Sequence, residues 1–341
     1  MATSLMETEA QEAPARVEAM LQTDGAVYAA LARRLAERPP VFAATVARGS
    51  SDHAATFLAT ALGLSGGLAT ASLPPSLVTR YGVRLSLGQA LVVGLSQSGA
   101  SPDIVATLEA AAASGATTAA IVNAEGSAMA AAADFVLPQR AGVERGVAAT
   151  KSFILTLVAA ARLVAAWRGD QELDAALRRL PERLEAALRC DWTPAIEVLE
   201  PAASLYVVGR GPGLGIAQET ALKLKETAGL HAEALSAAEI RHGPKAVIDE
   251  AFPVLAYGLA GPGGDDARVF AAEMAEAGAK VVVAAPGPAA GLHLPLPEPL
   301  HPLLDPIVAI QAFYPMAARL ALARGLDPDR PRGLRKVTET V

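Results

Sequence analysis

Short apolar runs alternate along this chain with longer segments in which alanine and leucine recur at helical spacing. The runs around 41–47 and 204–209 each lead through a glycine-containing loop into an alanine-rich segment, at 51–64 and 213–228 respectively. Strands that alternate with helices of this length form parallel sheets with right-handed crossovers. The pattern therefore predicts an α/β fold.

The same unit occurs twice in the sequence. Its first loop reads Val46-Ala47-Arg48-Gly49-Ser50-Ser51 in one copy and Val208-Gly209-Arg210-Gly211-Pro212-Gly213 in the other. Further on, each copy has a helix end with a glycine stop and then a strand, at 113–122 and 276–283. We therefore expect two tandem α/β/α sandwiches with parallel sheets, related by an internal repeat.

The repeat sets the expected domain organisation. A helix at 151–168 and a helical stretch near 171–198 would join the two sandwiches, and 303–325 would form a late helix. The predicted parts are an N-terminal helical arm (1–37, helical from 13), a first domain (38–170), a helical linker (171–198), a second domain (199–325) and a tail (326–341).

One loop of the first copy favours an anion. The strand at 91–96 ends in Ser96, Gln97 and Ser98, and Ser101-Pro102-Asp103 has the pattern of a helix N-cap, a first-position proline and a first-turn acid. Hydroxyls and free backbone N–H groups at a helix N-terminus suit a phosphate group. The alternative is a serine-rich turn without a ligand. The corresponding loop of the second copy, 258–264, lacks the serines.

Composition excludes several classes of function. The net charge is −6 and aromatic residues make up 4%, which argues against binding to nucleic acid. No apolar run approaches the roughly 20 residues of a spanning helix, and the acidic N-terminus does not resemble a signal peptide. The lone Cys190 excludes an internal disulfide and a multi-cysteine metal site. We expect a cytoplasmic protein that binds neither a membrane nor a nucleic acid.

Seven stretches of the chain resemble the sugar isomerase (SIS) family, and more narrowly the isomerase half of glucosamine-6-phosphate synthase and the stand-alone SIS-type glucosamine-6-phosphate deaminases. They occur in the family's order and cover nearly all of the chain beyond the arm. The stretches are Arg48-Gly49-Ser50-Ser51, Ser96-Gln97-Ser98-Gly99, Gly142–Lys151, Glu219–Glu226, His231-Ala232-Glu233-Ala234, Glu239–Pro244 and Asp329–Lys336.

The resemblance implies roles for individual residues. Glu226 would move a proton between C1 and C2, His242 would assist ring opening and reach into the partner subunit's site, and Lys336 would be a tail lysine able to form a Schiff base. Ser50, Ser101 and Arg335 depart from the synthase pattern, and Arg335 puts the tail contacts in doubt. The residues implied to contact or support the substrate are Ser51, Ser96, Gln97, Ser98, Ser101, Val147 (through its backbone), Glu219 and Lys223.

The residues themselves leave two interpretations open for each catalytic candidate. Glu219, Lys223 and Glu226 share one helix face, which is either a solvated ion-pair stripe or a stripe that faces a cleft. His242 precedes a Gly-Pro turn, where a histidine is often structural. The basic tail either frays or closes over an anionic substrate, with nearby arginines favouring a neutral Lys336.

The expected function is an amino-sugar phosphate isomerase that works as a hydrolytic deaminase, converting glucosamine 6-phosphate and water to fructose 6-phosphate and ammonia. No metal or other cofactor is expected, because carbonyl and imine chemistry suffices. The partners expected are a sugar-phosphate substrate and a second copy, in a homodimer with shared active sites. The expectation of a deaminase follows from the absence of a cysteine before Cys190, because the synthase's glutaminase domain needs one. The alternatives are a synthase-like isomerase, a fructosamine-phosphate deglycase, a galactosamine-6-phosphate deaminase and a non-catalytic sugar-phosphate sensor.

Overall fold

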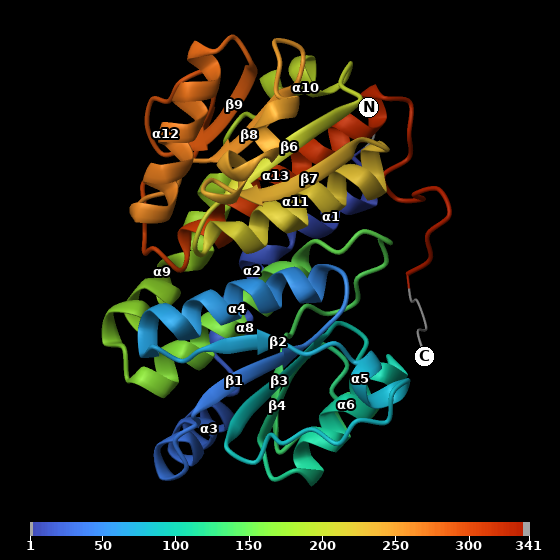
Figure 1. The fold of residues 1–341 in the computed structure, drawn as a ribbon, viewed down its shortest axis with the longest axis vertical. Coiled ribbons are helices and arrows are strands. Elements are labelled where there is room, and N and C mark those ends of the chain that lie inside the picture. The colour runs from blue at the N-terminus through green and yellow to red at the C-terminus, as the bar shows by residue number, and fades with distance from the viewer. Residues whose placement is uncertain (1–2, 337–341) are drawn as a thin grey trace. The chain divides into compact units, whose positions relative to one another are not determined.

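The computed structural model describes residues 3–336, and the chain divides into two compact units, each built around one parallel sheet (Figure 1). The first-sheet unit comprises residues 15–143 and 155–178. The second-sheet unit comprises the residues up to Pro14, 144–154 and 179–336. Residues 144–154, a loop and the start of a helix, thus belong to the second-sheet unit, whereas the predicted first domain (38–170) included them. The last five residues of the predicted tail lie outside the described residues.

The first-sheet unit has a five-stranded sheet with the order β2-β1-β3-β4-β5, and every neighbouring pair is parallel. The first strand therefore lies between the second and third. The chain through this unit runs α2 (Ala13–Leu21), α3 (Gly25–Glu37), β1 (Phe42–Val46), α4 (Ser50–Gly66), β2 (Thr70–Ser72), α5 (Ser76–Thr79), β3 (Ala90–Ser96), α6 (Pro102–Ala113), β4 (Thr117–Val122), α7 (Ala128–Ala131) and β5 (Phe135–Pro138). The helix α8 (Lys151–Arg168) belongs to this unit from residue 155 on, and the next helix, α9 (Gln171–Leu188), belongs to it up to residue 178.

The second-sheet unit repeats this topology with the order β10-β9-β8-β6-β7, again parallel throughout. Two sheets of the same strand order confirm the predicted α/β class and the internal repeat. The elements are α1 (Leu5–Gln11), α9 (Gln171–Leu188), α10 (Pro194–Leu199), β6 (Ser204–Gly209), α11 (Gly213–Ala228), β7 (His231–Ser236), the 3₁₀ helices η1 (Glu239–His242) and η2 (Pro244–Val247), β8 (Pro253–Tyr257), α12 (Pro262–Glu276), β9 (Lys280–Ala285), β10 (Leu292–Pro295) and α13 (Asp305–Ala323).

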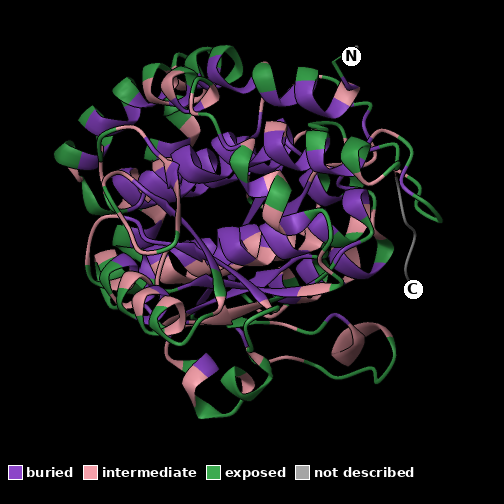
Figure 2. Ribbon diagram, turned by 90° about the horizontal axis from the view of Figure 1, so that it is seen from above, coloured by how far each residue is buried: buried purple, intermediate pink, exposed green. Residues whose placement is uncertain are grey.

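Local sequence explains where the elements begin and end. Every residue of β3 is buried, as expected for a central strand covered by helices on both faces. The helices instead alternate between buried and exposed faces (Figure 2). The glycine stops predicted after α6 and α12 are Gly115 and Gly278, whose φ angles are +87° and +91°. A positive φ suits glycine and ends each helix before the next strand.

The helix α13 is long and apolar enough, by length and composition, to cross a membrane. It is the core helix of the second-sheet unit, where it packs against α11 and α1, and 78% of its apolar stretch is buried. The helix α1 begins at Leu5, well before residue 13, where the predicted arm (1–37) was expected to become helical. Ser4 caps it by accepting a hydrogen bond from the Glu7 N–H, and Met6 and Ala10 are fully buried.

Candidate active site

The serine-rich loop lies at the topological switch point of the first sheet. Strands β1 and β3 are neighbours, and the connections that leave their carboxyl ends run in opposite directions along the sheet. Open α/β sheets bind ligands at this point. Gly49 precedes the first residue of α4, and Ser101 is the N-cap of α6, so two helix N-termini flank the same edge.

The structure brings the predicted phosphate-binding residues to this edge. Ser51 lies in the first turn of α4, Ser96 ends β3, and Gln97 and Ser98 follow it, partly exposed. The Ser96 hydroxyl accepts a hydrogen bond from the Gly99 N–H at 3.0 Å. The Ser101 side chain does not cap α6 as the sequence suggested. The Asp103 carboxylate instead accepts a hydrogen bond from the Ile104 N–H at 2.9 Å, and Pro102 has no N–H to offer.

An ion pair joins the two loops of this edge. The Arg48 guanidinium donates to the Asp103 carboxylate at 2.8 and 3.2 Å. Asp103 is 2% exposed, and the Arg48 side chain is half exposed. The sequence did not predict this ion pair, because its two residues lie in separate loops, more than fifty positions apart along the chain. Arg48 neutralises a buried carboxylate that would otherwise repel a phosphate at α6.

The stripe predicted on α11 forms a buried ion cluster in the second-sheet unit. Lys223 is 1% exposed and lies 3.5 Å from the Glu219 carboxylate, and it also donates a hydrogen bond to Glu226. Glu219 is fully buried, whereas the Glu226 side chain is 22% exposed. The solvated-stripe interpretation is therefore wrong. Burial acts to lower the pKa of Lys223, but the two carboxylates outweigh it and the pKa is raised.

The tail lysine, Lys336, forms an ion pair with a buried carboxylate of the second-sheet unit. Lys336 donates to the carboxylate of Glu144 at 2.9 Å, and Glu144 is 5% exposed. The group that contacts the Lys336 amine is thus a carboxylate, and not one of the arginines that lie near this lysine in the sequence. Burial acts to raise the pKa of Glu144, but Lys336, Ser152 and the Thr150 N–H together lower it. Glu144 lies in the stretch 142–151 that resembles the family, but the sequence alone predicted no role for it.

A second buried carboxylate holds the backbone next to Val147. Glu9 of α1 accepts hydrogen bonds from the N–H groups of Arg145 and Gly146, at 2.5 and 3.0 Å, and is 2% exposed. The sequence shows Glu9 only as part of an acidic N-terminal segment. Its partners lie more than 130 residues away, so no local signal could have identified it.

His242 is the last residue of η1, and its side chain is exposed. The next residue, Gly243, has a φ angle of +142°, which turns the chain sharply after it. Within residues 3–336 the His242 ring makes no hydrogen bond or ion pair, so the described structure does not tie it to Glu226 or Lys336. The same residues contain no group of three His, Cys, Asp or Glu side chains placed to hold a metal ion.

Comparison with known proteins agrees with this geometry. The model of the SIS domain matches residues 43–166 and 198–285, one match on each sheet. The chain belongs to the SIS-domain family. The glutamine–fructose-6-phosphate aminotransferase (isomerizing) of Aeropyrum pernix is 36% identical over 271 residues, which are 73% of this chain and 43% of that protein. The corresponding protein of Thermococcus kodakarensis is 35% identical over 261 residues, or 72% of this chain and 43% of its own length.

Among solved structures, a candidate phosphosugar isomerase of Silicibacter pomeroyi DSS-3 is 40% identical, with a TM-score of 0.91 over 96% of this chain and all of that one. The glucosamine-6-phosphate deaminase of Thermotoga maritima shares the fold at 20% identity, with a TM-score of 0.78 over 99% of this chain and all of that one. The chain spans less than half the length of the aminotransferases it matches.

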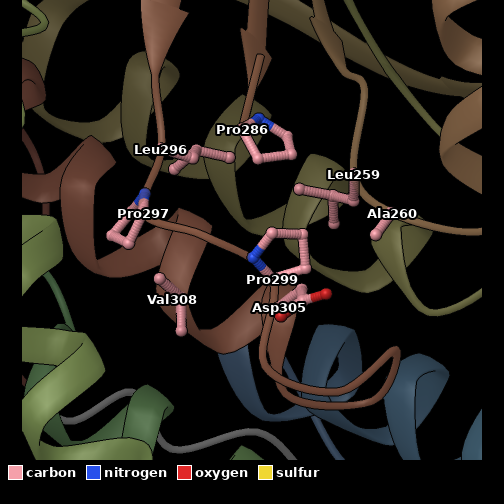
Figure 3. A pocket seen from close by; sticks show the side chains of 8 residues that line it. All are labelled: Leu259, Ala260, Pro286, Leu296, Pro297, Pro299, Asp305 and Val308. Atoms are coloured by element: carbon pink, nitrogen blue, oxygen red, sulfur yellow. The ribbon is translucent and has the colours of Figure 1, made fainter.

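The second SIS domain has a small, mostly apolar pocket at the carboxyl ends of its strands. Figure 3 shows a small pocket beyond the carboxyl ends of β8, β9 and β10, with room for about one water molecule. Asp305 is its polar residue; it accepts a hydrogen bond from the Leu300 N–H at 2.7 Å, and burial raises its pKa. The other lining residues are apolar: Leu259, Ala260, Pro286, Leu296, Pro297, Pro299 and Val308.

Two glycines in the loops of the second SIS domain pack closely against the backbone of other residues. A Cβ atom on Gly264 would lie 1.8 Å from the Leu259 carbonyl oxygen, and one on Gly263 would lie 2.6 Å from that of Arg210. A Cβ atom on Gly49 of the first SIS domain, or on its counterpart Gly211 of the second, would meet nothing within 4 Å. The serine loop of the first domain is also tightly packed at Gly99, where a Cβ atom would lie 2.1 Å from the Ser127 hydroxyl. The two repeats therefore differ in the side chains of these loops more than in how closely their glycines pack.

Proposed function

We propose that the chain is a sugar-phosphate isomerase that acts on an amino-sugar 6-phosphate and releases ammonia from it. The observation that carries the proposal is the ion cluster of the second-sheet unit. Three carboxylates, those of Glu144, Glu219 and Glu226, accompany two lysines, Lys223 and Lys336. Glu226 is the one of these three carboxylates whose side chain is partly exposed, so a substrate can reach it. The relatives' name, glutamine–fructose-6-phosphate aminotransferase, supports an amino-sugar phosphate as the substrate.

The reaction then follows from the residues present. The serine edge would bind the phosphate through neutral donors and two helix N-termini. After ring opening, Glu226 would take the proton from C2 while the C1 oxygen is protonated, which gives an enaminol. Return of a proton to C1, with loss of one from nitrogen, gives the 2-imine. Water then adds at C2 and ammonia leaves, so that fructose 6-phosphate is the product.

The test is ammonia release from a panel of hexosamine and fructosamine 6-phosphates. We expect glucosamine 6-phosphate to release ammonia and form fructose 6-phosphate in equal amounts. Preference for the galacto or fructosamine compound would change the substrate and keep the reaction class. Binding of every compound without ammonia release would identify a sensor and contradict the proposal.

The curated relatives favour a second candidate, a synthase-like isomerase, because they are named aminotransferases and are 35–36% identical to this chain. The reverse assay distinguishes it. Fructose 6-phosphate with free ammonia would then yield glucosamine 6-phosphate at a higher rate than deamination under the same conditions.

Loss of two serine hydroxyls should weaken substrate binding. Each hydrogen bond to a charged phosphate is worth about 1.5–3 kcal/mol. The double variant Ser96→Ala/Ser98→Ala should therefore raise KM by at least about a hundredfold, with a smaller change in kcat, because such groups bind ground and transition states alike. Ser114→Ala is the matched control, since that serine follows the far end of α6 and its hydroxyl donates to the Ala111 carbonyl at 2.7 Å. An unchanged KM in the double variant would place the phosphate elsewhere.

The exposed His242 is expected to serve a neighbouring subunit. Inactive Glu226→Gln and inactive His242→Ala proteins, mixed under conditions of subunit exchange, should recover activity because a hybrid dimer contains one intact site. A mixture of Glu226→Gln with the double variant Glu226→Gln/His242→Ala is the control, because none of its sites is intact. No recovery despite exchange verified by mass spectrometry would mean that each site takes both residues from one chain.

A further inference from the structure

The Glu144 carboxylate is fixed by donors on one side and open to the tail on the other. One oxygen accepts from the N–H groups of Thr150 and Ser152, at 3.0 and 3.1 Å. The other accepts from the Ser152 hydroxyl at 2.7 Å and from Lys336 at 2.9 Å. Three of the four donors belong to the start of α8, where free N–H groups favour an anion. The carboxylate is therefore held in place by groups other than the lysine.

The tail has two anchors in the second-sheet unit. Asp329 accepts hydrogen bonds from the N–H groups of Leu5 and Met6, at 2.7 and 2.8 Å, and so caps the N-terminus of α1. Lys336 then pairs with Glu144 seven residues further on. Leu334 and Arg335, which come just before the lysine, are exposed. The place of the Lys336 amine therefore depends on Glu144.

The other ionisable groups around Glu144 do not compete for this position. Lys223 is engaged by Glu219 and Glu226, and the buried phenol of Tyr314, whose pKa burial raises well above its usual value, stays neutral. Glu144 is thus the carboxylate available to Lys336, and the Lys336 side chain remains 25% exposed.

We propose that Glu144 is the positioning residue for the tail: its fixed carboxylate sets where the Lys336 amine stands and keeps that amine paired when no sugar is bound. Glu144 acts through Lys336 and does not itself touch the substrate. The inference rests on the proposed function only for the role of Lys336 in turnover.

The first test measures the reactivity of the Lys336 amine in the full chain without substrate. Competitive acetylation with acetic anhydride, read by peptide mass spectrometry, compares Lys336 with the exposed Lys245. In Glu144→Gln we expect the ratio to rise by roughly 10- to 100-fold, the factor that a charged hydrogen bond supplies. The matched control is Glu12→Gln, which removes the carboxylate that lies 2.8 Å from Lys151 and should leave the ratio unchanged.

An unchanged Lys336 ratio in folded Glu144→Gln overturns the proposal. If that variant fails to fold, Glu144→Asp replaces it, because it keeps the buried charge and withdraws it from the lysine by one methylene group. The ratio should then still rise, and an unchanged ratio has the same negative meaning.

The second test is kinetic. Glu144→Gln should lower kcat with little change in KM, and it should cause no further loss in a Lys336→Gln background, because both changes remove the same positioned amine. Losses that add in the double variant would show that Glu144 acts independently of the lysine and would overturn the proposal. If no sugar of the panel is turned over, the proposed function fails, while the acetylation result still decides the role of Glu144.

Discussion

Glu226→Gln is expected to lower kcat for ammonia release by about 10²- to 10⁴-fold, the usual worth of a positioned general base. The substitution keeps the size of the side chain and removes the base, so substrate should still bind. The fold should survive, because Lys223 retains Glu219 at 3.5 Å and the Glu226 side chain is partly exposed. The measurement is steady-state ammonia release together with substrate binding by calorimetry.

The matched control for this variant is Glu276→Gln, which removes an exposed carboxylate from the end of α12 in the same unit. It should leave kcat and KM unchanged. In the wild type, deuterium at C2 of the substrate should give a primary isotope effect if proton abstraction limits the rate. Full ammonia release by Glu226→Gln would remove this residue from the mechanism, and Glu219 would become the next candidate.

Lys223→Met is expected to cause the largest loss of stability. The variant fills a similar volume but removes the cation that lies 3.5 Å from the buried Glu219 carboxylate, and breaking a buried ion pair in this way typically costs about 3–5 kcal/mol. Urea unfolding should show the loss as a lower midpoint. Lys225→Met is the control, because that lysine is exposed on the same helix and should change stability by less than about 0.5 kcal/mol.

The pH dependence of this loss has a definite sign. The pKa of Lys223 is raised in the folded protein. Its contribution to the free energy of unfolding is therefore complete at pH values below the ordinary pKa of lysine, and it is lost only as the pH rises through the pKa of the folded state. The difference between wild type and Lys223→Met should therefore stay constant from about pH 6 to pH 9. Equal stability of the two proteins would mean that the cluster is not held together by this lysine.

The sequence predicted the regular elements well where their signals are local. The helices expected at 151–168 and 213–228 have those bounds in the structure, because apolar spacing and flanking glycines define both. The helical stretch near 171–198 is interrupted after Leu188. Asp191 accepts hydrogen bonds from Thr193, which forms a turn, and Pro194 then starts α10 as its first residue.

The carboxylates that the sequence did not reveal depend on partners far along the chain. Glu7 and Glu9 make the N-terminus look like a solvated acidic segment, yet Glu7 pairs with Arg319 and Glu9 binds the backbone at 145–146. Glu144 likewise needs Lys336, almost two hundred residues later. A buried charge is possible only with such partners, and no local pattern of residues displays them. The serine edge was predictable because its hydroxyls, its glycine and its helix start are contiguous.

The close packing of Gly263 and Gly264 in the second SIS domain bears on how many substrate molecules one chain binds. Duplicated folds invite the expectation of two equivalent sites, yet the loop 258–264 has no hydroxyl side chain to offer a phosphate, and the close packing of Gly264 leaves no room for one there. Titration calorimetry should therefore give a stoichiometry of one sugar phosphate per chain. Grafting serines onto residues 258–264 should not create a second site, because any side chain at Gly264 would collide with the Leu259 carbonyl. The repeat is thus a duplication of architecture, in which the hydroxyl side chains expected to bind the phosphate occur in the loop of the first copy and not in the corresponding loop of the second.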